Sequence, residues 1–392
     1  MPHFSFFTPH SKEPVTQDNP LWQQPIPLRL DALLKADDAS VSHADYFQAA
    51  QAFLEARSYD VVTRAASQRL DRRIKPHDIS EIRIRLEKHG AYYHPARIEI
   101  SIGQKRLSLV LNVALSDSGQ RFVESDYRHL KRLNAETPFH YLPHVYGWDR
   151  ITLSEGLNFG MFLGEWFEGY HEFHMALDPA DRKPKIVIWD ETRGRFFLTA
   201  EQTQTLYAQA AKILTCYYNP MSFEQILAWH HAAGDFVVSI KKKELRLRLV
   251  TVRRYATIFE KQEQAKTDAN DPRRILQALL VFFLHLSIQM RLDRLEGIGE
   301  MAWSDKMAVD ATLTGFLEAL ALKPDIDSLP DSLLACFLAY LAACQASDLL
   351  DLSEAIINRF NPRLPELPVI KENLSEHVET LHDAIQDWLE ML

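Results

Sequence analysis

The sequence predicts an α+β protein whose first half is rich in β-strands and whose second half is mostly helical, with the change near residue 200. Two observations carry this prediction. Apolar residues occupy every second position over 82–86 and again over 98–102, which is the period of a strand with one solvent-exposed face. From residue 271 onward, apolar segments with helical spacing are interrupted mainly by glycine and proline, which is typical of consecutive helices.

The first half contains an extended arm, a helix and a set of strands. Prolines oppose regular helix over residues 1–42, so this segment is predicted to be extended. Helical spacing of apolar residues begins at His43 and continues to about Leu70. The remaining pattern predicts strands, with a helix after the third, over 82–86, 98–102, 107–115, 122–133 (the helix), 145–148 and 160–166.

The second half begins with a strand over 185–189 and a helix over 199–217, which Thr199 caps. A β-hairpin is predicted near 236–252, with lysines at its turn. The apolar segment 275–290 is about 16 residues long, shorter than the roughly 20 that a bilayer span needs. It is therefore predicted to be a buried helix, and no membrane association is expected.

Composition limits the function classes. The chain has 392 residues, a net charge of −9 and a pI near 6.0, which disfavours a general nucleic-acid-binding protein. Its three cysteines are too few for a disulfide framework, and its first residues lack the basic and apolar regions of a signal peptide. A cytoplasmic protein is expected.

Three local patterns carry the functional argument. The segment 161–169 reads Met-Phe-Leu-Gly-Glu-Trp-Phe-Glu-Gly, an apolar strand that ends in acidic and aromatic residues. Glu124 lies near the start of the helix after the third strand. The segment 231–235, His-Ala-Ala-Gly-Asp, lies between a long helix and the hairpin.

These patterns and the order of elements resemble the protein-kinase-like fold, in its aminoglycoside phosphotransferase and choline-kinase branch. The resemblance implies two lobes: an N-lobe over 43–165, with an antiparallel sheet and one helix, and a mostly helical C-lobe over 166–392. It implies ATP with Mg²⁺ as cofactor and a nucleotide or small phosphorylated ligand as partner. The implied catalytic residues are Asp235 and His231, and the implied nucleotide-binding residues are Asn112, Glu124, Glu165, Trp166 and Arg253.

Three departures from the family pattern argue against a conventional kinase. Asn112 stands where the family has a lysine, and the loop between the first two strands offers only Gly90 where nucleotide-covering loops use several glycines. The segment 250–254, where a metal-binding carboxylate is expected, contains none. The usual electrostatic stabilisation of a transferring phosphoryl group is then missing. The sequence predicts an atypical or catalytically degenerate kinase-like protein that binds a nucleotide or phosphorylated ligand between its lobes.

Three alternatives stay open. In the structural one, His231 and Asp235 hydrogen-bond their own turn, with Arg253 as partner. In the second, two histidines and a carboxylate form the metal site of a hydrolase or oxygenase, from pairs such as His171 with His174 or His230 with His231. In the third, the chain is a non-catalytic scaffold that uses the amphipathic stripe of its last helix, formed by Val378, Leu381, Ile385, Trp388 and Leu389.

Overall fold

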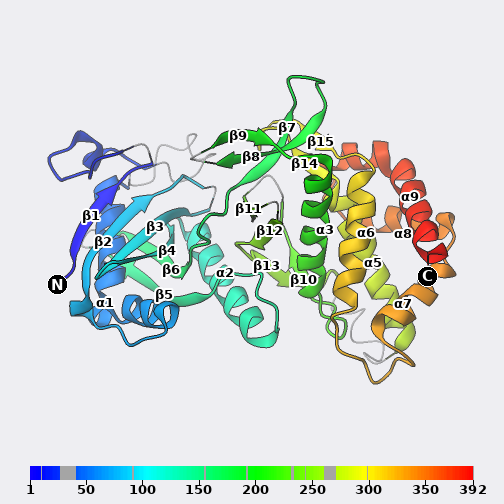
Figure 1. The fold of residues 1–392 in the computed structure, drawn as a ribbon, viewed down its shortest axis with the longest axis horizontal. Coiled ribbons are helices and arrows are strands. Elements are labelled where there is room, and N and C mark those ends of the chain that lie inside the picture. The colour runs from blue at the N-terminus through cyan, green and yellow to red at the C-terminus, as the bar shows by residue number, and fades with distance from the viewer. Residues whose placement is uncertain are drawn as a thin grey trace. The chain divides into compact units, whose positions relative to one another are not determined.

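The structure is a computed structural model that describes residues 1–9, 11–26, 41–90, 92–153, 156–190, 193–230, 234–242, 244–259, 271–297 and 299–391. The chain divides into two compact units, Met1–Glu168 (unit 1) and Gly169–Leu392 (unit 2). Unit 1 contains the large sheet, and unit 2 contains smaller sheets and most of the helices (Figure 1). The predicted combination of helices and strands is present, and the second unit also contains strands.

Unit 1 is built on a six-stranded sheet with the order β1-β2-β3-β4-β6-β5. Alternating burial along β3, from buried Ile98 to buried Ile100, confirms the predicted strand with one apolar face. The strands are β1 (His3–Phe7), β2 (Ile79–Leu86), β3 (His94–Ile102), β4 (Lys105–Ala114), β5 (Val145–Thr152) and β6 (Asn158–Glu165).

Strand β1 makes the sheet mixed. It pairs in parallel with β2, with Ser5 opposite Arg83, whereas every other pair in this sheet is antiparallel. The prediction of a purely antiparallel sheet is therefore wrong at this edge. The cause is the long connection from β1 to β2, which includes a whole helix and returns the chain in the same direction. The first residues, interpreted as an arm, thus supply an edge strand.

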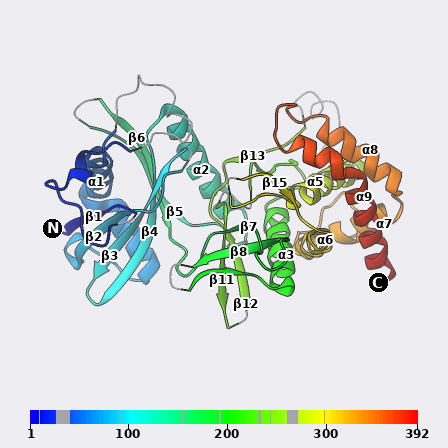
Figure 2. The same ribbon diagram turned by 90° about the horizontal axis from the view of Figure 1, so that it is seen from above.

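Helices α1 (His43–Leu70) and α2 (Asp117–Glu136) cover opposite faces of this sheet (Figure 2). Leu111 and its cross-strand partner Leu163 belong to the core that α1 completes. The neighbouring pair, Asn112 and Phe162, lies on the other face, where the Phe162 ring contacts Tyr127 of α2 at 6.0 Å. The sheet is therefore covered on both faces at β4 and β6, whereas every second residue of β3 stays partly exposed.

Unit 2 begins with the sheet β7-β8-β9, and three two-stranded sheets follow. The predicted hairpin is present as β11 and β12, with Phe236 opposite Leu249. The strands are β7 (Phe173–Leu177), β8 (Pro184–Asp190), β9 (Gly194–Phe197), β10 (Gln225–Leu227), β11 (Phe236–Lys241), β12 (Glu244–Leu249), β13 (Arg254–Ala256), β14 (Leu292–Arg294) and β15 (Met301–Trp303). Strand β10 pairs with β13, and β14 pairs with β15.

The helices of unit 2 pack closely. They are α3 (Ala200–Cys216), α5 (Pro272–Met290), α6 (Met307–Leu320), α7 (Leu333–Ala342), α8 (Ala346–Ile357) and α9 (Leu367–Glu390). The Thr199 hydroxyl accepts the Gln202 N–H at the start of α3, as the sequence predicts. Helices α3 and α6 approach so closely that a Cβ on Gly315 would lie 1.9 Å from the Ala208 carbonyl oxygen. Only glycine fits at that position.

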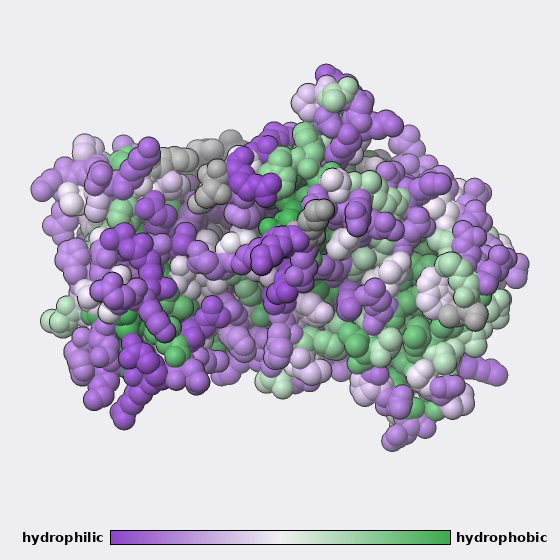
Figure 3. Space-filling model, viewed as in Figure 1, coloured by the Kyte–Doolittle hydropathy of each residue, from purple (hydrophilic) through white to green (hydrophobic). Residues whose placement is uncertain are grey.

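The apolar helix α5 is mostly buried within unit 2, as predicted for 275–290. Among the described residues, no single helix is both long and apolar enough to cross a bilayer, and the pair α7–α8, bent by 109°, passes that test only when its two helices are taken together. On the face that Figure 3 shows, hydrophobic residues gather over the helical part of unit 2, and unit 1 is mostly hydrophilic.

Candidate functional site

Among the predicted site residues that the structure describes, Asp235 is the most deeply buried, and it immediately precedes β11. Its partner Arg253 lies in the short segment between β12 and β13. The Arg253 Nη1 donates to Asp235 Oδ2 at 2.8 Å, and the second terminal nitrogen bonds Oδ1. The exposed fraction is 2% for the Asp235 side chain and 18% for Arg253. This is a two-pronged ion pair in which the carboxylate is removed from solvent.

Backbone groups complete the environment of the pair. The His230 N–H donates to Asp235 Oδ2 at 2.9 Å, and Arg253 Nη1 also donates to the Ala228 carbonyl at 3.0 Å. The Val250 N–H donates to the Asp235 carbonyl at 2.7 Å. The two side chains therefore tie the segment before β11 to the segment after β12, which fixes both ends of the hairpin. These are the contacts that the structural alternative expects of Asp235 and Arg253.

The His230 imidazole lies beside this pair. Although part of the side chain touches solvent, the surrounding protein and then the positive charge of Arg253 lower its pKa, and the charge of Arg294 adds to this. Glu366 acts in the opposite direction. These causes disfavour the protonated imidazole. His231, the other predicted catalytic residue, lies outside the described residues.

Arg294 and Glu366 also lie near His230, and the sequence does not predict that they meet there. Arg294 Nη2 lies 3.5 Å from Glu366 Oε1, and the second carboxylate oxygen, Oε2, is buried without a hydrogen-bond partner among the described residues. The two residues come from β14 and from the segment before α9, far from each other and from His230 in sequence. No local pattern connects such distant segments.

In unit 1, the predicted nucleotide-binding residues do not form one cluster of mutual contacts. Asn112 of β4 is buried on the face covered by α2. Glu124 of α2 binds two arginines instead: Arg128 at 2.5 Å on its own helix and Arg150 at 3.0 Å on β5. The charge of Glu124 is therefore balanced by arginine, where the family resemblance implies a lysine on the third strand.

Glu165 and Trp166, at the end of β6, are also engaged by arginines. Glu165 forms an ion pair with Arg69 and accepts the His144 N–H at 3.3 Å. The Arg97 guanidinium lies over the Trp166 ring, 5.2 Å from its centroid. These side chains stabilise the end of the sheet by contacts within unit 1.

The metal-site alternative finds no support among the residues that the structure describes, where no group of three or more metal-ligating side chains converges. His171 and His174 are three residues apart along an extended segment, so they point to opposite faces. His171 pairs with Asp190 at 3.6 Å, and His174 pairs with Glu296 at 3.7 Å. The two histidines therefore lie beside different carboxylates, and burial lowers the pKa of His174, which disfavours its charged form.

The apolar stripe of α9 is largely used inside unit 2. Val378, Leu381 and Ile385 are buried, with exposed fractions of 3% or less. The same helix provides His377, whose Nε2 lies 3.1 Å from the Ser287 hydroxyl of α5. The stripe that the scaffold alternative assigns to a partner thus docks α9 within the unit.

Comparisons with known proteins add little to this geometry. No family model matches the sequence, and no curated protein matches it. Among solved structures, the chain is similar to WaaP, solved in complex with acyl carrier protein, with 10% sequence identity and a TM-score of 0.31. The similar region covers 69% of this chain and 86% of the other. A similarity of this size identifies neither a family nor an activity.

Proposed function

We propose that this chain is a kinase-like protein that has lost phosphoryl transfer and binds a nucleotide or another phosphorylated ligand without reacting with it. The order of elements supports the proposal. In unit 1, helix α2 follows the third of the antiparallel strands, and in unit 2 the order is α3, β10, a loop with Asp235, the β11–β12 hairpin and β13. This is the order that the resemblance implies for a kinase-like fold.

The observation that carries the proposal is the state of Asp235. A catalytic base must reach the proton of its substrate at hydrogen-bond distance. The Asp235 carboxylate is instead 2% exposed and bonded to Arg253 and to the His230 N–H. Because a carboxylate paired in this way holds its neighbouring loops together, its geometry favours a structural role over proton transfer.

The residues around Asp235 do not fit a Mg²⁺ ion. Mg²⁺ in nucleotide sites is usually held by one or two carboxylates together with phosphate oxygens. The segment that precedes β13 supplies the Arg253 guanidinium, and the nearby Asp235 carboxylate is occupied by it. Ligand binding is therefore proposed to be independent of divalent metal.

The test is a thermal-shift titration with ATP, alone and with Mg²⁺, combined with an ATP turnover assay. We expect ATP at millimolar concentration to raise the Tm equally with and without Mg²⁺, because only the folded state binds the nucleotide. We expect no turnover by the wild type or by Asp235→Asn. Asp383→Asn, the control at an exposed carboxylate of unit 2, should likewise show none. Mg²⁺-dependent turnover that Asp235→Asn loses while it stays folded by circular dichroism would overturn the proposal. Absence of any Tm shift would exclude ATP as the ligand.

A further inference from the structure

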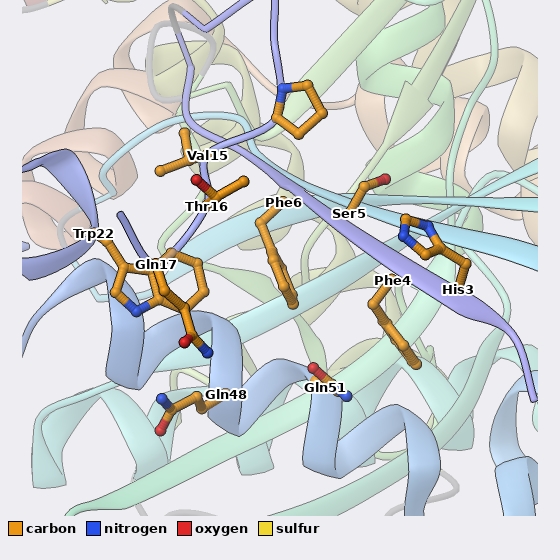
Figure 4. Close-up of a pocket in the computed structure, with 11 residues that line it drawn as sticks. His3, Phe4, Ser5, Phe6, Val15, Thr16, Gln17, Trp22, Gln48 and Gln51 are labelled. Atoms are coloured by element: carbon orange, nitrogen blue, oxygen red, sulfur yellow. The ribbon is translucent and has the colours of Figure 1, made fainter. Parts of the chain in front are cut away.

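A pocket of about 440 Å³ lies beside β1 in unit 1 (Figure 4). It differs from the Asp235 region because the described residues that line it include no Asp, Glu, Lys or Arg. Aromatic rings and side-chain amides dominate the lining, which consists of His3, Phe4, Ser5, Phe6, Pro14, Val15, Thr16, Gln17, Trp22, Gln48 and Gln51. A pocket with this lining suits an uncharged, partly apolar group.

The backbone of β1 adds a second feature. β1 is the edge strand of the sheet, and on its outer side the Val15 N–H donates to the Phe6 carbonyl at 2.7 Å. Alternate residues of a strand direct their backbone groups to the same side. The N–H and C=O of Phe4 therefore also point to this outer edge, where the described residues supply no backbone partner. An edge of this kind is a template for another strand.

Side chains beside this edge line the pocket and close one end of it. Phe4 and Phe6 point toward α1, where Gln48 and Gln51 lie one helical turn apart (Figure 4). Trp22 closes one end: it is 4% exposed, and its ring centroid lies 5.4 Å from that of Phe6. The Gln51 Nε2 already donates to Glu55 Oε1 at 3.0 Å, and the side-chain amides as a group still offer donors and acceptors to a backbone or an uncharged polar group.

We infer that the β1 edge binds an extended, uncharged segment of a partner protein, which adds as a strand beside Phe4 and places apolar side chains in the pocket. Strand addition combines main-chain hydrogen bonds with pockets for alternate side chains, and both are present here. The chain itself already makes one such bond at Phe6, through Val15. This site is separate from Asp235, so the inference does not depend on the function proposed above.

The experiment selects random eight-residue peptides on phage against the full chain and measures the Kd of enriched peptides by fluorescence anisotropy. We expect uncharged sequences with apolar residues at alternate positions. Gln48→Trp fills the pocket from an exposed position of α1 and should weaken binding about tenfold or more, roughly 1.4 kcal/mol. Gln68→Trp, at an exposed position of the same helix outside the lining, should bind as the wild type does.

A scan of N-methylated peptides then tests strand pairing directly. Because Val15 already bonds the Phe6 carbonyl, methylation should abolish binding at the residue that donates to the Phe4 carbonyl and should be tolerated at its two neighbours. Unchanged binding by Gln48→Trp, or a methyl scan without one sensitive residue between two tolerant neighbours, would overturn the inference. Failure to select any peptide would also overturn it. If neutral small molecules then raised the Tm of the wild type but not that of Gln48→Trp, the pocket would be a small-molecule site.

Discussion

The Asp235–Arg253 pair of unit 2 and the β1 edge of unit 1 place polar groups in opposite situations. At Asp235, two opposite charges are buried together, and each carboxylate oxygen has a donor. At β1, uncharged amides and half-buried aromatic rings surround a pocket, and the backbone groups of Phe4 face outward without a backbone partner among the described residues. The Asp235 region contains residues that the sequence predicts to be functional, and the β1 edge contains none of them.

The two regions show that a side chain with reactive chemistry is not necessarily available to a ligand. A charged side chain in the folded protein is available to a ligand only if its existing partners leave an accessible atom. Arg253 satisfies both carboxylate oxygens of Asp235, although the Arg253 Nε is buried without a hydrogen-bond partner among the described residues, so removing either side chain should change stability first. The pocket residues make weaker mutual contacts and retain surface, so substitutions there should change binding first.

The largest effect is expected from Arg253→Leu. The substitution leaves the Asp235 carboxylate buried without its cation, and breaking a buried pair on one side costs about 3–5 kcal/mol. The double substitution Asp235→Leu with Arg253→Leu removes both charges and should be less destabilised than Arg253→Leu alone. Urea unfolding of the wild type, Arg253→Leu, Asp235→Leu and the double variant measures this coupling. If the two single losses simply add in the double variant, the pair is not coupled and the comparison with β1 fails.

Much of the fold was predictable because its signals are local. The alternation around Ile98 and Ile100 identifies β3, and Thr199 identifies the start of α3. Strand β1 was missed because its segment is short, lies in a proline-rich context, and is held by β2, more than 70 residues away. Sequence periodicity carries no information about which distant strand will pair with a short segment.

The candidate site was predictable in part for the same reason. Asp235 and Arg253 flank one hairpin, so their pairing followed from a local element and was one of the stated alternatives. The Arg294–Glu366 pair near His230 joins segments that meet only in the folded unit. The β1 pocket likewise combines three separate segments, around Phe4, Val15 and Gln48, and none contains a recognisable motif.

A smaller effect is expected from pH, through buried histidines that stay neutral. Burial, with His89 as a minor cause, lowers the pKa of His94 in unit 1 to about 4, and burial with Arg291 lowers that of His377 in unit 2 to about 3. Between these values and 6.5 the unfolded chain binds protons that the folded chain does not, so stability rises with pH in this window. The contribution of these histidines to the free energy of unfolding should be fully present above pH 6.5 and should fall as the pH drops toward 4. For His94 the loss should amount to up to about 3 kcal/mol.

Urea unfolding at several pH values between 4.5 and 7 checks this dependence. His94→Gln should flatten the slope, because glutamine does not titrate. An equally steep slope in the variant would show that His94 titrates alike in the folded and unfolded chain. Exposed His77 is the matched control, and His77→Gln should leave the slope as it is in the wild type.

The smallest effect is expected from Arg246→Leu at the β11–β12 hairpin. Arg246 Nε donates to Glu244 Oε1 at 2.9 Å, so this pair resembles Arg253–Asp235 in its chemistry and belongs to the same hairpin. Its side chains are 64% and 63% exposed, however, and solvent and salt screen such pairs. The Tm should therefore stay within error of the wild type, at low and at high salt. A loss comparable to that of Arg253→Leu would mean that position in the hairpin, and not burial of the charge, determines the cost. Burial of paired charges would then no longer explain the difference between the Asp235–Arg253 pair and the polar groups at the β1 edge.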